Sequence, residues 1–420
     1  MEVIKTQTIL FFNHTAKWSG GEISLFGLVV NLDRLRYTPL VVLAGEGKLA
    51  ERLQALNIET IVLPLTPDIV EARKEALGLK SLLNPMRLLR GGKYVLRLAR
   101  LIRKHKVDLV HCNSLKSDLI GGAAAKLARV PCVWHVRDRI DEDYLPSRIA
   151  RSFRFLARHL PAGILANSKS TLQTLQLSGS MSSRSRVAHP GVSLREYSPL
   201  PFLQGTPNDR QRLILVGRIT PWKGQDVFIE AAAQIAPRWP KALFQIVGVP
   251  MFGEEDYERG LHEQVKRHGL EAQVEFVGFS DKVPDLLQKA DIFVHASKLG
   301  EPFGKVIVEA MACGKPVIAT DGGALREIVI PGSVTEVQKG ETGLLVPMNS
   351  VEEMANAMEA LLLDSVRAAL MGKNGRCRAE QLFTVEATTK EVEDLFDLLT
   401  VRGRHRKQIP RKPKSYGALL

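Results

Sequence analysis

The sequence predicts an α/β protein with two parallel-sheet domains arranged in tandem. Short apolar runs alternate with helix-length segments through both halves of the chain, which is typical of parallel sheets covered by helices. A chain of 420 residues also exceeds one ordinary core, since domains usually span roughly 100–200 residues. Between the halves, the segment 191–211 is rich in proline and polar residues and is the predicted linker.

The predicted first domain spans residues 1–190. An amphipathic helix is expected to start at Glu22, and the expected strands are 8–13, 40–44, 60–64, 107–112, 132–136 and 163–166. The run 107–112 ends in polar Asn113 and Ser114 before a helical segment, and that is the edge where α/β sheets carry their sites. We therefore expect the chemistry at the carboxyl ends of the strands.

The predicted second domain spans residues 212–380 and repeats the same alternation. A helix is expected at 351–363, and the expected strands are 212–217, 242–247, 274–277, 291–296, 316–320 and 343–347. Residues 381–400, with a helical pattern at 385–399, form an expected closing helix that packs back towards the first domain. The tail 401–420 is too basic and too interrupted by proline to pack, so it is predicted to be disordered.

Composition excludes several classes of protein. Apolar residues make up 45% and charged residues 25% of the chain, which are globular proportions. No stretch approaches the ~18 apolar residues of a membrane span. The apolar run 9–12 is too short for a signal peptide, so we expect a cytoplasmic protein. Four cysteines stand singly, which indicates buried free thiols rather than disulfides or a zinc site: Cys112, Cys132, Cys313 and Cys377.

The charge is strongly positive and partly local. The formal net charge is +13, and seven of the positive charges lie in the segment 402–414, which contains no acid. No zinc-finger, RNP-type or helix-turn-helix pattern accompanies this charge, so no nucleic-acid partner is expected. An anionic lipid surface or a phosphorylated substrate remains open as the partner.

The segment 301–320 carries the strongest chemical signal. Glu301 follows the strand 291–296, and Gly304 can open a helix whose second turn holds Glu309. Two carboxylates and the positive end of a helix dipole would then converge on one crevice, which suits a diphosphate. By themselves, two glutamates after a strand favour an ordinary strand, loop and helix with solvated carboxylates.

The surrounding sequence makes the pattern specific. Glu-x7-Glu within residues 301–323 resembles the signature of retaining GT-B glycosyltransferases of family 4, also called glycosyl transferases group 1. Segments 216–224, 291–297 and 340–347 resemble the same family, so the resemblance spans roughly residues 212–365. It implies a GT-B fold, in which two Rossmann-like domains face each other across a cleft. The first domain would hold the acceptor side and the second would bind a sugar nucleotide, with neither cofactor nor metal ion.

The residues fit the chemistry that this resemblance implies. A departing nucleoside diphosphate develops negative charge, and preorganised cations lower that barrier. Arg218 and Lys223, five residues apart, can supply a planar fork and a point charge, although each alone would be read as a surface cation. The resemblance implies that Glu301 contacts the donor sugar and Glu309 the ribose hydroxyls. Four further residues of this segment are expected to line the donor site: Phe303, Gly304, Lys305 and Val306.

The first half resembles the family more loosely, over roughly residues 8–200. Gly20 and Gly21 stand after the first strand and before a helix, like the family's glycine pair beside the donor, although a plain turn explains them equally well. His135 matches a family histidine that faces the sugar and is expected to be catalytic with Glu301, Arg218 and Lys223; a strand-end histidine is more often structural. At 190–193 the chain reads Pro-Gly-Val-Ser where the family usually has Asn-Gly-Val-Asp.

Two other readings compete with a transferase. A nucleotide-sugar epimerase shares a similar scaffold, and fold alone does not separate the two. The other alternative is a non-catalytic polyanion-binding protein. The presence of all four charged residues of the family pattern argues against it: Arg218, Lys223, Glu301 and Glu309. For a transferase, the expected partners are a sugar nucleotide and a glycan or lipid-linked acceptor in polysaccharide or cell-envelope biosynthesis.

A basic helical face favours location at a membrane surface. The segment 93–104 combines an apolar stripe with a basic face, and more cations follow at Arg148, Arg151, Arg154 and Arg158. Each cation near an anionic leaflet contributes about 1 kcal/mol of attraction. We therefore expect peripheral association with the inner face of the membrane, while the apolar stripe packs on the protein's own sheet.

Overall fold

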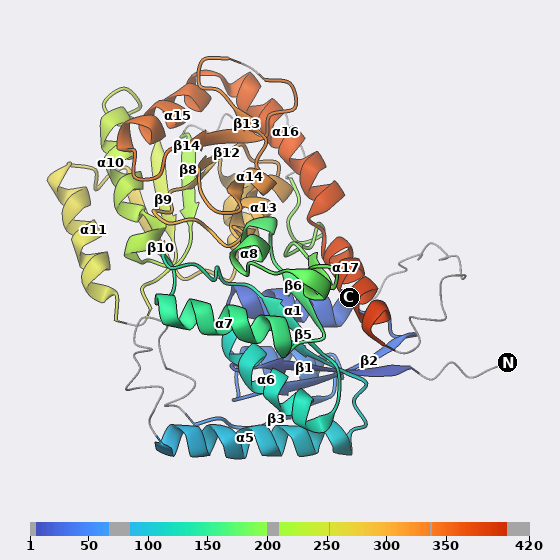
Figure 1. Ribbon diagram of the computed structural model, residues 1–420. Coiled ribbons are helices and arrows are strands. Elements are labelled where there is room, and N and C mark those ends of the chain that lie inside the picture. The colour runs from blue at the N-terminus through green and yellow to red at the C-terminus, as the bar shows by residue number, and fades with distance from the viewer. Residues whose placement is uncertain (1–5, 67–84, 200–209, 252, 337, 401–420) are drawn as a thin grey trace.

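The computed structural model describes residues 6–66, 85–199, 210–251, 253–336 and 338–400, and Figure 1 shows them as two stacked α/β domains. The expected basic tail 401–420 and the middle of the expected linker lie outside these ranges.

The N-terminal domain contains a seven-stranded sheet, in the order β3-β2-β1-β4-β5-β6-β7, whose described strand pairs are all parallel. The strands are β1 Gln7–Asn13, β2 Tyr37–Leu43, β3 Thr60–Val62, β4 Leu109–Cys112, β5 Cys132–Val136, β6 Gly163–Ala166 and β7 Ser185–Val187. The helices are α1 Gly20–Asn31, α2 Lys48–Ala55, α5 Pro85–Lys104, α6 Leu115–Ala128, α7 Ser147–His159, α8 Lys169–Thr174 and α9 Gly179–Ser182.

Strand β1 shows why this half of the sequence forms a covered sheet. Leu10 and Phe12 pack into one apolar cluster, while Ile9 and Phe11 pack into another on the opposite face. All four side chains are fully buried, which explains the continuous apolar run in place of an alternating pattern. Helix α5 closes one of these faces with Tyr94, Leu98 and Ile102, so its stripe is core, as expected.

The C-terminal domain repeats the architecture with the order β10-β9-β8-β11-β12-β14-β13, again parallel throughout the described strand pairs. The strands are β8 Arg212–Val216, β9 Leu243–Val247, β10 Val274–Gly278, β11 Ile292–His295, β12 Val317–Thr320, β13 Pro331–Gly332 and β14 Gly343–Val346. The helices are η1 Pro221–Lys223, α10 Gln225–Ile235, α11 Glu255–Arg267, α12 Val283–Lys289, α13 Lys305–Ala312, α14 Leu325–Ile328, α15 Val351–Leu363, α16 Ser365–Leu382 and α17 Val385–Leu399.

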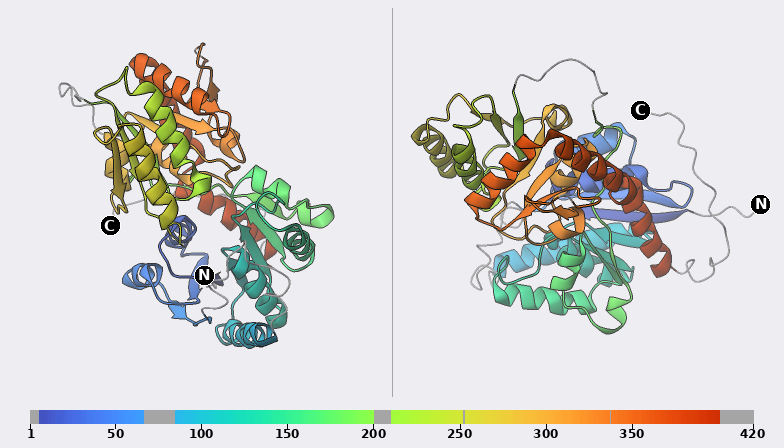
Figure 2. Two further views of the ribbon diagram at one scale, coloured as in Figure 1. Left: turned by 90° about the vertical axis from the view of Figure 1, so that its left-hand side faces the viewer. Right: turned by 90° about the horizontal axis from the view of Figure 1, so that it is seen from above.

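The last helix returns to the N-terminal domain. Figure 1 shows α16 on the C-terminal domain and α17 beside α1, and Figure 2 shows the same crossing between the two lobes from other sides. The ring of Phe396 on α17 lies 6.3 Å from Phe11 and 5.8 Å from Tyr37, centroid to centroid. At the crossing, Thr388 Oγ1 donates a hydrogen bond of 2.6 Å to the carbonyl oxygen of His189.

The predicted fold class is confirmed, because both halves form parallel α/β sheets. The twelve expected strands are present with ends that differ by a few residues at most, while the short strands β7 and β13 and the helix α16 had not been predicted. The cysteine prediction is wrong for Cys377, which is exposed on α16; the other three thiols are buried. The domain limits themselves stay a prediction.

Candidate active site

The strand orders of the two sheets indicate where a ligand site lies. In each sheet the order reverses between two neighbouring strands, β1 and β4 in the first domain and β8 and β11 in the second. Loops that leave the carboxyl ends of such strands diverge and leave a crevice for ligands. The loop after β8 carries Arg218 and Lys223, and the loop after β11 carries Glu301.

Glu301 lies at the centre of a buried polar cluster. Its Oε1 pairs with Lys223 Nζ and accepts a hydrogen bond of 2.8 Å from Ser297 Oγ, and it lies 3.1 Å from His295 Nε2. Burial raises the pKa of Glu301, but Lys223 and His295 outweigh burial, so the net pKa is well below the ordinary value. Glu301 is therefore an ionised carboxylate at neutral pH.

His295 and Ser297 were not singled out from the sequence. Both side chains are buried and they lie 3.1 Å apart, Ser297 Oγ to His295 Nε2. Burial lowers the pKa of His295 against the opposing effect of Glu301. The signal available in the sequence was their place at the carboxyl end of β11, inside the segment 291–297 that resembles the family.

The two expected cations lie in one loop, and each has a carboxylate partner. Lys223 ends the short helix η1, and its Nζ lies 4.3 Å from the ring centroid of Trp222 while it pairs with Glu301. Arg218 Nε lies 3.7 Å from Glu254 Oε2. Gly224 allows the loop to turn into α10, because its φ is +70° and a Cβ there would collide with the carbonyl oxygen of Ala296.

Helix α13 presents the second carboxylate. Gly304 precedes the helix with φ +98°, which favours glycine, and Glu309 lies on the second turn. Glu309 is largely buried and its Oε1 lies 2.7 Å from Lys305 Nζ. Phe303 is buried beside the helix start, and Val306 is partly exposed.

The glycine pair of the N-terminal domain follows β1, as expected, but the first helix begins two residues earlier than predicted. Gly20 and Gly21 are the first two residues of α1 and not a turn before it. The pattern Ser-x-x-Glu from Ser19 to Glu22 is typical of a helix start. The Ser19 side chain makes no cap hydrogen bond to the backbone here; its hydroxyl donates to the Glu22 carboxylate instead. The carbonyl oxygen of Gly21 accepts a hydrogen bond of 3.2 Å from Asn113 Nδ2, which ties the helix start to the end of β4.

His135 is fully buried near the end of β5. Its Nδ1 lies 3.3 Å from Arg137 Nη2 and 3.2 Å from His111 Nε2. Burial, Arg137 and His111 all lower its pKa, so the ring is neutral at physiological pH. A guanidinium only donates, so Nδ1 accepts and the proton resides on Nε2. Within the described residues this buried Nε2 has no hydrogen-bond partner.

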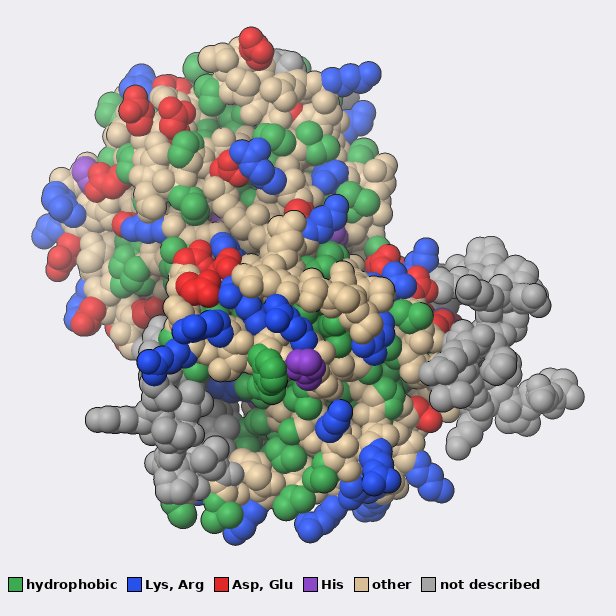
Figure 3. Space-filling view, viewed as in Figure 1, with side chains coloured by type: hydrophobic (Ala, Val, Ile, Leu, Met, Phe, Trp, Pro, Cys, Tyr) green, Lys and Arg blue, Asp and Glu red, His purple; other side chains and the backbone are tan. Residues whose placement is uncertain are grey.

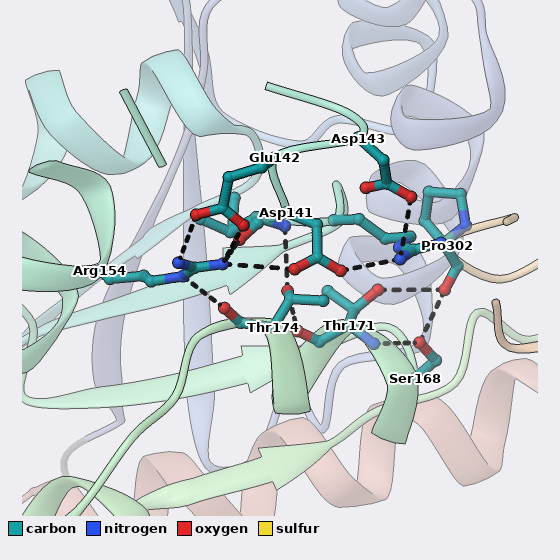
Figure 4. Close-up of polar contacts among 10 residues, drawn as sticks. Asp141, Glu142, Asp143, Arg154, Ser168, Thr171, Thr174 and Pro302 are labelled. Carbon is teal, nitrogen blue, oxygen red and sulfur yellow. Dashed lines mark hydrogen bonds and ion pairs between the residues drawn. The ribbon is translucent and has the colours of Figure 1, made fainter. Parts of the chain in front are cut away.

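The domains meet directly beside Glu301. Ser168 Oγ and Thr171 Oγ1, at the start of α8, donate hydrogen bonds of 2.7 and 3.1 Å to the carbonyl oxygen of Pro302. Figure 4 shows this contact together with the acidic loop that follows β5. In the same interface, the Glu327 carboxylate accepts hydrogen bonds from the backbone N–H groups of Lys169 and Ser170 at 2.8 and 2.7 Å.

Two parallel sheets in this order, with paired cations after β8 and Glu-x7-Glu after β11, define the class of GT-B glycosyltransferases. Family models agree. The model described as Glycosyltransferase Family 4 matches residues 19–196, and the one described as Glycosyl transferases group 1 matches residues 200–378. Since the two matches together span most of the chain, this protein is a GT-B glycosyltransferase.

Named relatives are similar over much of their length. The lipopolysaccharide core biosynthesis mannosyltransferase LpsB of Rhizobium meliloti (strain 1021) is 28% identical, over 64% of this chain and 80% of that protein. The UDP-Gal:alpha-D-GlcNAc-diphosphoundecaprenol alpha-1,3-galactosyltransferase of Escherichia coli is 26% identical, over 79% of this chain and 86% of that protein. Anabaena Alr3699/HepE in complex with UDP-glucose has a TM-score of 0.76 at 28% identity, covering 93% of this chain and 99% of that one.

Proposed function

We propose that the protein transfers a hexosyl unit from a uridine diphosphate sugar to a glycan or lipid-linked acceptor, with retention of anomeric configuration and without a metal ion. The observation that carries this proposal is the buried cluster of Glu301, Lys223, His295 and Ser297 beside the start of α13. It joins an ionised carboxylate for sugar hydroxyls to a cation for the diphosphate.

The charge of each residue suits a different part of the donor. Lys223 and Arg218 neutralise charge on the departing diphosphate, and their carboxylate partners hold both cations in the loop before the donor arrives. Neutral His135 donates from Nε2 to a hydroxyl of the sugar, and Glu309 accepts from the ribose hydroxyls. The donor-binding residues are those of the family pattern: Gly20, Gly21, Arg218, Lys223, Phe303, Gly304, Lys305, Val306 and Glu309.

The relatives support the choice of donor and acceptor. HepE was solved with UDP-glucose, and the name of the Escherichia coli relative specifies UDP-Gal and a diphosphoundecaprenol-linked acceptor. LpsB is named for lipopolysaccharide core biosynthesis. A uridine diphosphate hexose and a lipid-linked or polysaccharide acceptor are therefore the first substrates to test.

The test is a panel of sugar nucleotides with the purified protein in the presence of a metal chelator. We expect thermal stabilisation by a uridine diphosphate hexose, release of UDP when acceptor is added, and a product whose anomeric proton coupling matches the donor's configuration. An inverted product contradicts the retaining mechanism. An isomerised sugar nucleotide formed without acceptor identifies an epimerase, and no donor binding at all leaves the polyanion-binding alternative.

We also propose that the enzyme works at the inner face of a membrane. None of the helices in the described ranges is both long and apolar enough to cross a membrane. Figure 3 shows Lys and Arg side chains gathered on the N-terminal domain. Exposed members of this surface are Lys93, Arg97, Arg100, Arg103 and Lys104 on α5, and Arg148, Arg151 and Arg158 on α7. Phe155, 60% exposed, lies among the latter.

The prediction that Arg154 belongs to the basic surface is wrong. Arg154 is buried, because its guanidinium turns inwards to Glu142 and to the carbonyl oxygens of Ile140 and Thr174. The remaining cations predict binding to anionic vesicles at low salt that is lost at high salt. Equal recovery in the supernatant with anionic and neutral vesicles contradicts the membrane proposal.

A further inference from the structure

The peptide segment that carries Glu301 is held on both sides by the N-terminal domain. On one side, the carbonyl oxygen of Pro302 accepts hydrogen bonds from Ser168 and Thr171. On the other side, Gly300 lies directly against Arg139, since a Cβ built on Gly300 would overlap the guanidinium nitrogen Nη1. Both chain neighbours of the catalytic carboxylate therefore touch the other domain.

Arg139 is itself held in place. Its Nη2 donates a hydrogen bond of 2.8 Å to Asp141 Oδ2 and lies 3.3 Å from Asp143 Oδ2, and its side chain is only 15% exposed. Figure 4 shows Asp141 and Asp143 in this loop, with Asp141 also turned towards Arg154, whose Nη2 lies 3.3 Å from Asp141 Oδ1. Because two carboxylates neutralise this guanidinium, its contribution at Gly300 is contact and shape and not an additional charge for the donor.

The loop that carries Arg139 is held by the buried side chain of Arg154. Arg154 of α7 donates to the carbonyl oxygen of Ile140 at 2.6 Å and pairs with Glu142 at 2.9 Å, Nη1 to Oε1. Its Nε also donates to the carbonyl oxygen of Thr174 at 2.8 Å, which joins the loop to the end of α8. Arg139 is thus connected through Asp141 and Arg154 to the end of α8. Figure 4 shows Asp141, Arg154 and Thr174 of this connection.

On the side away from the N-terminal domain, the segment 300–302 contacts residues of its own C-terminal domain. The carbonyl oxygen of Glu301 accepts a hydrogen bond of 2.9 Å from the backbone N–H of Ala324, and Gly323 pairs with Glu301 as an isolated bridge. A Cβ on Gly300 would also lie 3.0 Å from the backbone nitrogen of Gly323. The strip 300–302 is therefore enclosed between the two domains.

We propose that Arg139 is a positioning residue for Glu301, which with Ser168 and Thr171 fixes the strip 300–302 when the two domains meet. This inference rests on the proposed transfer function. A carboxylate displaced by about 1 Å from its productive position can lose about a hundredfold in rate. The donor site in the C-terminal domain is thus completed by contacts from the N-terminal domain, and its turnover depends on that contact more than its nucleotide affinity does.

A double-mutant cycle tests the contact. Arg139→Ala and Gly300→Ala are each expected to lower kcat by about tenfold or more, with the nucleoside diphosphate Kd within about twofold of wild type. The double variant should be no slower than the slower single variant, because both changes disturb one contact. The matched control is Arg238→Ala, which removes a surface arginine paired with Glu359 and should change neither quantity.

Amide hydrogen exchange across residues 298–304 gives a readout that needs no turnover. Exchange should be faster in Arg139→Ala than in wild type and in Arg238→Ala, and Thr171→Val, which removes one hydroxyl contact to Pro302, should shift it in the same direction with a smaller loss of kcat. Multiplicative kcat losses in the cycle, or unchanged exchange in both variants, overturn the inference. If wild type transfers no sugar, the proposed function fails, whereas the exchange measurement still decides whether Arg139 holds this strip.

Discussion

Replacing Lys223 with alanine removes the cation that lies between the Glu301 carboxylate and the ring of Trp222. Two effects follow from the structure. A donor phosphate loses a charge-assisted hydrogen bond, and Glu301 loses the strongest of the partners that lower its pKa. The variant therefore tests leaving-group stabilisation and carboxylate ionisation together.

The size of the first effect, the lost hydrogen bond to a donor phosphate, follows from the usual strength of such a bond. A charge-assisted hydrogen bond contributes about 1.5–3 kcal/mol, which corresponds to a loss of roughly 10- to 150-fold in kcat/KM. The second effect, on the pKa of Glu301, has a defined direction. The pKa of Glu301 in the folded protein is below its ordinary value of 4.5, so its ionised form stabilises the fold above that pH, and this contribution is lost as pH falls through the lowered pKa. Without Lys223, burial raises the pKa, and the acid limb of the pH–rate profile moves to higher pH.

The assay is release of nucleoside diphosphate with acceptor present, measured for kcat/KM between pH 4 and pH 8. Lys289→Ala, a change at an exposed lysine of the same domain, is the control and should match wild type. An unchanged kcat/KM in Lys223→Ala refutes the leaving-group role. A pH–rate profile of Lys223→Ala with the same shape as that of wild type between pH 4 and pH 8 refutes the assignment of Glu301 as the carboxylate that Lys223 keeps ionised.

Three further changes probe nucleotide binding and stability. Glu309→Gln should weaken nucleoside diphosphate affinity by about tenfold with kcat retained, measured by calorimetry, because the charged acceptor for ribose is lost; a fall confined to kcat contradicts this. Arg367→Met leaves Glu341 buried and unpaired, its Oε1 having lain 2.7 Å from Arg367 Nε, and should cost about 3–5 kcal/mol of unfolding free energy. Phe396→Ala opens a cavity where α17 meets Phe11 and should cost about 3–5 kcal/mol, whereas a melting temperature equal to wild type contradicts the packing role of α17.

Errors in the sequence predictions have identifiable causes. The expected start of the first helix is Glu22, whereas α1 begins at Gly20; the pattern Ser-x-x-Glu from Ser19 to Glu22 is typical of a helix start and could have indicated the earlier beginning. Arg154 shares the spacing of the exposed arginines on α7, and only the acidic loop packed against that helix makes its burial favourable. Strands β7 and β13 are short and only partly buried, so neither carries an apolar run that would reveal it.

Local sequence patterns were enough to predict the two parallel sheets and the Glu-x7-Glu geometry, because apolar periodicity and a glycine before a helix act over a few neighbouring residues. Gly304 does open α13 and Glu309 does lie on its second turn. The surroundings of Glu301, in contrast, depend on how distant segments of the chain pack together. His295 and Ser297 reach it through the local turn after β11, but Ser168 contacts Pro302 from 134 positions away in the chain. Such a contact depends on how two complete domains pack, and that packing sums many weak contacts that no local pattern records.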